Sequence, residues 1–128
     1  MIKIKGIEHL GIFAKDTAAL KDWYVKMFDF RVALDTGTGI YFIMAPDGFM
    51  FELIPTIEDG GVLGNKVSGI RHIALTVDDF EEAVEKVIAA KIEVVSGPTV
   101  LAAGGKVFFF RDPEGNVLHF INRPEPIK

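Results

Sequence analysis

Cysteine is absent from all 128 residues of the chain. Its absence excludes a disulfide framework, a cysteine nucleophile and a metal site built on thiolates. Positive charge is also scarce, because 14 lysines and arginines stand against 18 aspartates and glutamates, for a formal net charge of −4. A nucleic-acid-binding protein needs clustered cations to neutralise phosphates, and an anionic membrane surface would repel this chain. We therefore expect neither nucleic acid nor a membrane among its partners.

Long apolar runs are missing as well. No segment approaches the ~18 consecutive apolar residues that a membrane-spanning helix needs, and residues 1–5 hold no stretch typical of a signal peptide. We therefore expect a cytoplasmic protein. Hydrophobic residues nevertheless make up 49% of the chain and aromatic residues 11%, which is enough for a core. A chain of this length is expected to form one domain, or two half-domains that share a core.

The chain contains an internal repeat of two similar halves. Residues 6–10 (Gly-Ile-Glu-His-Leu) resemble residues 69–73 (Gly-Ile-Arg-His-Ile) at an offset of 63 positions. Residues 46–54 (Pro-Asp-Gly-Phe-Met-Phe-Glu-Leu-Ile) resemble residues 113–121 (Pro-Glu-Gly-Asn-Val-Leu-His-Phe-Ile) at an offset of 67. Both ends of one module therefore recur in the same order, which predicts a structural unit that occurs twice.

All three histidines and one glutamate occupy corresponding places in this repeat. His9 corresponds to His72, and Glu52 corresponds to His119. Imidazole and carboxylate groups bind divalent transition metals. Taken singly, a histidine beside apolar residues is more often a hydrogen-bonded core residue, and a lysine or arginine could neutralise Glu52. Their joint occurrence at equivalent positions favours a single metal site formed by all four residues.

Apolar periodicity predicts the same order of elements in each half: one strand, one helix and three further strands. The predicted strands cover residues 7–13, 31–35, 40–46, 50–55, 70–77, 92–95, 106–111 and 116–122. The fold class is therefore α+β, with two β-α-β-β-β modules at about residues 6–55 and 69–122. Residues 56–68 form the linker between them, and residues 123–128, with two prolines, form an exposed tail.

Two apolar stripes with helical spacing mark the helices. They comprise Leu20, Trp23, Tyr24, Met27 and Phe28 in the first half, and Phe80, Ala83, Val84, Val87 and Ile88 in the second. The expected N-cap is Asp16 or Thr17 for the first helix and Asp78 or Asp79 for the second.

Strand alternation predicts where the four candidate ligands point. In the first strand Leu10 and Ile12 suit the helix-facing side, which leaves His9 on the opposite face. The same reasoning turns the other three away from the helices, and we expect an apolar-walled cleft lined by His9, Glu52, His72 and His119. Gly11 and Ala74, two residues beyond the first-strand histidines, would leave room for a ligand. At least one ring of the consecutive phenylalanines at 108–110 should also face this cleft.

The repeated element order and several sequence marks resemble the vicinal oxygen chelate superfamily. That group includes glyoxalase I, methylmalonyl-CoA epimerase, extradiol dioxygenases, fosfomycin-resistance enzymes and bleomycin-binding proteins. The marks lie at residues 7–12, 23–30, 51–53, 71–79 and 110–116, and the resemblance covers about residues 6–122. It implies a curved, barrel-like mixed sheet around a central cleft, with the modules paired within one chain or between two. A homodimer is expected on this resemblance.

The resemblance assigns the metal to His9, Glu52, His72 and the residue at position 119. Family members such as glyoxalase I usually place a glutamate at that fourth position, and this chain departs from them with His119. The implied cofactor is one divalent ion of Ni, Zn, Co, Fe or Mn. An alternative keeps only the first three residues on the metal, with His119 contacting the substrate or supporting the other ligands.

Two smaller departures lie where the helices end. Asp29 and Lys91 stand at positions where the family often has glycine. Glycine is favoured after a helix because the residue there often adopts a positive φ. Aspartate tolerates that region better than lysine. We read both as local changes within the same fold.

Three functions follow, all with a small molecule as the partner. The first is a glyoxalase-like lyase or isomerase, in which the metal polarises one of two adjacent substrate oxygens and a carboxylate moves a proton. Glu52 is the one carboxylate among the four, so it would serve as ligand and as catalytic base. The second is an Fe(II) dioxygenase, built on two histidines and one carboxylate. The third is a sequestering protein of the bleomycin-resistance type, where the acidic charge would favour a cationic ligand.

Overall fold

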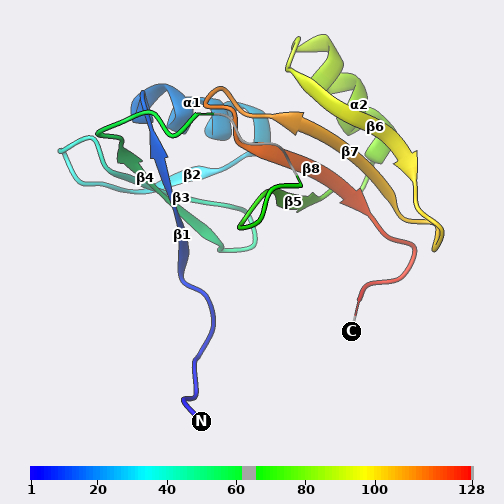
Figure 1. The fold of residues 1–128 in the computed structure, drawn as a ribbon, viewed down its shortest axis with the longest axis horizontal. Coiled ribbons are helices and arrows are strands. Elements are labelled where there is room, and N and C mark those ends of the chain that lie inside the picture. Colours follow the sequence, from blue (N-terminus) through cyan, green and yellow to red (C-terminus); the bar gives the residue numbers. More distant parts are fainter. Residues whose placement is uncertain (62–65, 128) are drawn as a thin grey trace. The chain divides into compact units, whose positions relative to one another are not determined.

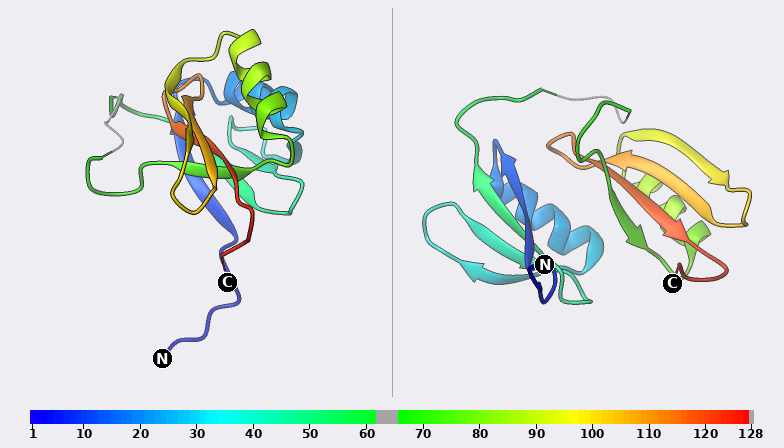
Figure 2. Two further views of the ribbon diagram at one scale, coloured as in Figure 1. Left: turned by 90° about the vertical axis from the view of Figure 1, so that its right-hand side faces the viewer. Right: turned by 60° about the horizontal axis from the view of Figure 1, so that its bottom comes forward.

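The computed structural model describes residues 1–61 and 66–127. The chain divides into two compact units, Met1–Gly60 and Gly61–Lys128. Each unit contains one four-stranded mixed sheet and one helix in the order β-α-β-β-β, which confirms the predicted α+β class and the module (Figure 1). In the right-hand view of Figure 2, each helix lies along one face of its own sheet.

The division between the units falls inside the linker predicted at 56–68. Part of that linker, residues 62–65, lies outside the described residues, as does the last residue of the tail predicted at 123–128. Of the helices in the described ranges, none has the length and apolar character that crossing a bilayer requires. The pairing of the two modules around a shared cleft stays a prediction.

Unit 1 builds its sheet in the order β1-β4-β3-β2. Its elements are β1 (His9–Ala14), α1 (Thr17–Phe28), β2 (Arg31–Asp35), β3 (Tyr41–Met44) and β4 (Met50–Pro55). Strand β1 runs parallel to β4, and the other neighbours are antiparallel. The first strand begins at His9 and not at residue 7 as predicted, because His9 already lies opposite Met50, where β4 starts. Residues 7 and 8 therefore have no strand to pair with.

Unit 2 repeats this topology in the order β5-β8-β7-β6. Its elements are β5 (Ile73–Thr76), α2 (Phe80–Ala89), β6 (Val94–Val100), β7 (Lys106–Arg111) and β8 (Val117–Asn122). The prediction ended the sixth strand at residue 95, which is wrong: β6 continues through a cis Gly97–Pro98 bond to Val100. A proline is tolerated here because β6 is an edge strand, and two register shifts against β7 accommodate it.

Aspartate caps the start of both helices, as predicted. The Ala19 amide donates to the Asp16 carboxylate at 2.9 Å, and the Glu82 amide donates to the Asp79 carboxylate at 3.0 Å. Of the two alternatives given for each helix, the residue directly before the first helical turn is the cap. Each carboxylate satisfies an amide that has no partner within the helix, which fixes where the helix begins.

Both helices end in a residue with a positive φ, as expected at positions where the family often has glycine. Asp29 after α1 has φ 56° and Lys91 after α2 has φ 57°. The Lys91 amide donates to the Ile88 carbonyl at 3.0 Å, and the Ile92 amide donates to the Val87 carbonyl at 3.3 Å. This pair of bonds is the Schellman ending of a helix, which normally recruits glycine at the left-handed position.

Aromatic rings fill the space between helix and sheet in unit 1. Tyr24 of α1 is fully buried, and its ring centroid lies 5.3 Å from that of Phe30 and 5.4 Å from that of Phe51 on β4. Leu20 is buried beside it on the predicted helical stripe, and Trp23 is half-buried. The helix therefore contributes Tyr24, the largest fully buried side chain of this core, and the sheet side contributes the phenylalanine rings around it.

The core of unit 2 takes more of its rings from the sheet. Helix α2 contributes Phe80 with the small Val84 and Val87, and three further buried rings lie on the sheet. These rings belong to Phe108, Phe110 and Phe120. Ile88, predicted in the helical stripe, is 58% exposed, because its position about 80° around the helix from Phe80 lies at the edge of the stripe.

Candidate metal-binding pairs

Unit 1 brings together His9 and Glu52, two of the four predicted residues. His9 opens β1 and Glu52 lies on the adjacent strand β4, directly opposite Gly11. Because side chains two residues apart share a face of the strand, His9 and Glu52 become diagonal neighbours. The Nε2 atom of His9 lies 3.5 Å from the Oε1 atom of Glu52. Both side chains are partly exposed, on the face of the sheet away from the buried Phe51 and Leu53.

Unit 2 brings together the other two residues, His72 and His119, by the same diagonal. His119 lies on β8 directly opposite Ala74, and His72 lies two residues before Ala74. The centroids of the two imidazole rings are 4.7 Å apart. His119 is 7% exposed and lies deeper than either residue of the unit 1 pair, whereas His72 is exposed.

A neighbouring carboxylate orients the His9 ring. The Nδ1 atom of His9 lies 3.0 Å from Oε1 of Glu8. A carboxylate only accepts hydrogen bonds, so this contact places a proton on Nδ1. The lone pair of the neutral ring is then on Nε2, the nitrogen nearer to Glu52. A ligating histidine commonly donates its second N–H to a carboxylate in this manner.

A backbone carbonyl does the same for His119. Its Nδ1 atom lies 3.1 Å from the Phe120 carbonyl oxygen, which leaves the Nε2 lone pair available. Burial lowers the pKa of His119 below its ordinary value; the Phe120 carbonyl opposes this effect, and the charges of His72 and Arg123 add to it. The ring is therefore held in the neutral form that a metal requires.

Phe42 and Phe109 are repeat-equivalent residues beside the two pairs; from the sequence, Phe109 is only one of three candidates to face the cleft, and Phe42 is not predicted there. Phe42 lies opposite Glu52 in the pairing of β3 with β4, and Phe109 lies opposite His119 in the pairing of β7 with β8. The Phe42 ring lies 5.5 Å from that of His9. The offset of 67 that relates Glu52 to His119 also relates these two phenylalanines, and it was the available signal.

Among the three consecutive phenylalanines at 108–110, Phe109 is the ring that takes the histidine face. Its centroid lies 4.5 Å from that of His119 and 5.8 Å from that of His72. Phe108 and Phe110 point to the other side of β7 and are buried in the core. Phe109 faces the histidines because it lies opposite His119 in the pairing of β7 with β8. A run of three identical residues does not reveal which of them takes that position.

The spacing of the two donor atoms in unit 1 fits a divalent metal ion. Two ligands about 2.1 Å from one ion lie roughly 3.0–3.4 Å apart at octahedral or tetrahedral angles, close to the 3.5 Å between His9 Nε2 and Glu52 Oε1. Within the described residues no group of three or more metal-binding side chains gathers. Each unit holds two of the four predicted residues.

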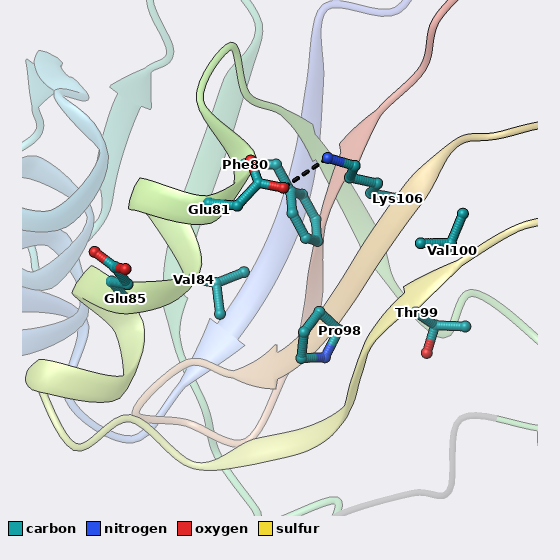
Figure 3. A pocket seen from close by; sticks show the side chains of 8 residues that line it. All are labelled: Phe80, Glu81, Val84, Glu85, Pro98, Thr99, Val100 and Lys106. Carbon is teal, nitrogen blue, oxygen red and sulfur yellow. Dashed lines mark hydrogen bonds and ion pairs between the residues drawn. The ribbon is translucent and has the colours of Figure 1, made fainter.

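A separate hollow of about 470 Å³ lies in unit 2 between α2 and the strands β6 and β7 (Figure 3). It is lined by Phe80, Glu81, Val84, Glu85, Pro98, Thr99, Val100 and Lys106. Lys106 and Glu81 form an ion pair of 2.6 Å across one end. None of the four candidate ligands lines it, so this hollow is not where a metal would sit.

The repeat explains why that hollow opens in unit 2. Its residues Phe80 and Lys106 stand where unit 1 has Thr17 and Gly39. In unit 1 the Thr17 hydroxyl donates to the Gly39 carbonyl at 2.6 Å, which joins the start of the helix directly to the loop between β2 and β3. Larger side chains at both positions replace that contact in unit 2.

Comparisons with known proteins agree with this fold. The family model described as Glyoxalase/Bleomycin resistance protein/Dioxygenase superfamily matches residues 6–120. A glyoxalase/dioxygenase from Nostoc punctiforme is structurally similar, with a TM-score of 0.77 at 19% identity, covering 94% of this chain and 92% of that one. A lactoylglutathione lyase from Agrobacterium tumefaciens has a TM-score of 0.70 at 21% identity, covering 92% and 93%.

A third similar structure is the fosfomycin resistance protein FosX from Listeria monocytogenes, complexed with Mn(II) and sulfate. Its TM-score is 0.77 at 15% identity, covering 94% of this chain and 92% of that one. At such identities these structures share the fold, while the family model extends over nearly the whole sequence. The chain belongs to the Glyoxalase/Bleomycin resistance protein/Dioxygenase superfamily.

Proposed function

We propose that this protein is a divalent-metal-dependent enzyme of the glyoxalase type. It would bind a small substrate through two adjacent oxygens and transfer a proton between neighbouring carbon atoms. The proposal rests on one observation. In each of the two donor pairs, a histidine (His9 or His119) has its Nδ1 atom at a hydrogen-bond acceptor, which leaves its Nε2 atom available to a metal. The Mn(II) in the FosX structure supports a metal, and the lyase from Agrobacterium tumefaciens supports the reaction type.

In this proposal His9, Glu52, His72 and His119 together hold one ion. Because each unit supplies two donors, the complete set requires one pair from each kind of unit, from the same chain or from a second copy. We propose a homodimer by likeness to the superfamily, in which modules pair within one chain or between two. When bound, the ion acts as a Lewis acid on a substrate carbonyl oxygen, which acidifies the adjacent C–H bond. The donor set of three imidazoles and one carboxylate suits Ni, Zn, Co, Fe or Mn.

Glu52 is the residue we assign as the proton carrier. Its carboxylate is the one acidic group in the set, since His119 stands at the equivalent position in unit 2. One carboxylate oxygen takes the proton from the carbon beside the carbonyl and returns it to the neighbouring carbon. A metal-bound imidazole lacks a free basic nitrogen for this step. The half-exposed Glu52 side chain leaves a substrate free to approach it.

The first experiment is elemental analysis of protein purified without an affinity tag, beside a His72→Ala variant. We expect close to one metal per complete four-ligand set in the wild type and at least tenfold less in the variant. Thr76→Ala, on the same exposed face of β5, is the matched control and should keep its metal. A wild type without metal, even after reconstitution, would overturn the proposal in favour of a sequestering protein.

The identity of the metal separates the enzyme classes. Ni, Co or Zn favours the isomerase or lyase, whereas Fe favours the dioxygenase, for which two histidines and one carboxylate suffice. Glu52→Gln then tests the proton carrier, because glutamine keeps the shape but cannot accept a proton. We expect proton exchange at the substrate carbon to fall by at least 100-fold while bound metal is still detected. Unchanged turnover in Glu52→Gln would remove Glu52 as the base.

A further inference from the structure

His72 differs from the other two histidines in what holds its ring. The His9 ring has the Glu8 carboxylate at Nδ1, and the His119 ring has the Phe120 carbonyl. In the part of the chain that the structure describes, the interactions of the His72 ring are with two other rings, those of Phe109 and His119. No hydrogen-bond partner orients it there.

His72 also lies on a segment with little backbone support. It precedes β5, which begins at Ile73, and its side chain is exposed. An exposed side chain outside a strand ladder samples several rotamers. When a ligand side chain points correctly for only a fraction of the time, its apparent affinity for a metal is reduced to that fraction of the intrinsic affinity.

We propose that Phe109 is a positioning residue that holds His72 and His119 as a preformed pair of metal ligands. This inference rests on the proposed metal-dependent function. The ring of Phe109 meets the His72 ring edge-on, at 5.8 Å and 90°, and lies beside the His119 ring at 4.5 Å and 31°. With the 4.7 Å contact between the imidazoles, the three rings form a closed cluster.

Position in the sheet explains why Phe109 can do this. It lies on β7 opposite His119 on β8, and β5 lies on the other side of β8. Its ring must therefore reach across β8 to contact His72, which an aromatic side chain can do on one face of a sheet. A leucine at this position keeps an apolar side chain but is too short to contact the His72 ring across β8.

The counterpart in unit 1 has a smaller task. Phe42 meets the His9 ring edge-on at 5.5 Å and 89°, but His9 is also held by Glu8. At the position equivalent to Glu8, unit 2 has Arg71, whose guanidinium donates to the Val67 and Ser68 carbonyls. Arg71 is thereby turned away from any role in orienting His72, and the aromatic contact takes its place.

The test is Phe109→Leu, with Zn²⁺ affinity of metal-stripped protein measured by competition with a chelator. We expect the affinity to fall by about tenfold, the lower end of the loss seen when a supporting group of a ligand is removed. Phe109→Trp should restore it to within about threefold. Phe42→Leu should lose less than Phe109→Leu, because Glu8 still orients His9.

Phe108→Leu is the matched control. Phe108 is 1% exposed and packs on the opposite side of β7, so its truncation costs stability without touching the histidines. Among variants that remain folded, we expect Phe108→Leu to bind Zn²⁺ within about twofold of wild type. A Phe109→Leu variant with wild-type affinity, or a Phe108→Leu variant with the same loss, would overturn the proposal.

A second readout separates this proposal from the proposed function. In the metal-free protein, three-bond NMR couplings report the χ1 rotamer of His72. We expect one dominant rotamer in the wild type and averaging among rotamers in Phe109→Leu. If the wild type binds no metal, the proposed function fails while this result still stands. An averaged His72 side chain in the metal-free wild type would refute the positioning role.

Discussion

The two units share a topology and a diagonal pair of donor residues, yet they distribute bulk and burial differently. In unit 1 the helix places Tyr24 against Phe51 of the sheet, and the donor pair is partly exposed. In unit 2 the helix contributes Phe80 and two valines, three buried rings lie on the sheet, and His119 of the donor pair is buried. The repeat thus preserves the strand register and metal-binding side chains at the donor positions. On the other face of each sheet, the two units fill their cores with different side chains.

The means of orientation differ in the same way. The exposed His9 of unit 1 is held by a charged neighbour, Glu8, whose contact is weakened by solvent and salt. The pair of unit 2 is held by a carbonyl and by the ring of Phe109, which act without charge. A site assembled from both halves would combine one adaptable pair with one fixed pair. In the proposed function, unit 2 would anchor the metal and unit 1 would supply the proton carrier.

The largest expected difference between the units concerns their cores. Tyr24 and Val87 occupy equivalent positions on the two helices, and each is at most 1% exposed. Tyr24→Ala should lower the free energy of unfolding by about 3–5 kcal/mol, and Val87→Ala by about 2 kcal/mol, because truncating the aromatic ring leaves the larger cavity. Equilibrium denaturation in urea measures both. Equal losses would show that the packing contrast between the units has no energetic consequence.

The second difference concerns pH. Because burial lowers the pKa of His119 from 6.5, the unfolded chain binds a proton at this residue more readily than the folded one. The contribution is complete above that ordinary value and is lost as pH falls through the folded-state pKa. We expect the metal-free protein to lose stability as pH falls from above 6.5 toward the lowered folded-state pKa of His119, before most carboxylates titrate. In His119→Gln, the urea concentration at the unfolding midpoint should depend less on pH over this range. If the midpoint fell with pH as much in the variant as in the wild type, the assignment to His119 would be wrong.

Much of this arrangement was predictable, because it depends on local rules. Strand alternation placed His9 and Glu52 on the face away from the helix, and the aspartate caps marked both helix starts. The repeat offsets singled out the four residues, and the structure brings them together two by two within each unit. Each of these inferences depends on periodicity or on a single side chain near its own backbone.

What escaped prediction depends on pairing between strands. The role of Phe109 follows from its register against His119, and the extension of β6 past Pro98 follows from its place at the sheet edge. Within the sequence, Gly97-Pro98 is a breaker signal, and only the absence of a further neighbour makes it harmless. The joining of the two donor pairs into one site stays a prediction for the same reason, since it depends on contacts that no local pattern encodes.

The smallest expected difference lies where the helices end. Lys91 and Asp29 both adopt a left-handed φ, which costs a residue with a Cβ about 1 kcal/mol, although aspartate tolerates it better than lysine. Lys91→Gly should therefore raise the free energy of unfolding by about 0.5–1 kcal/mol, and Asp29→Gly by less than about 0.5 kcal/mol. Thermal and urea denaturation of both variants provides the measurement. Lys91→Ala removes the charge but keeps the Cβ, so it should give no gain. If Lys91→Ala stabilised the protein as much as Lys91→Gly, the lysine side chain and not its backbone conformation would be the source of strain. The helix endings of the two units would then differ only in charge.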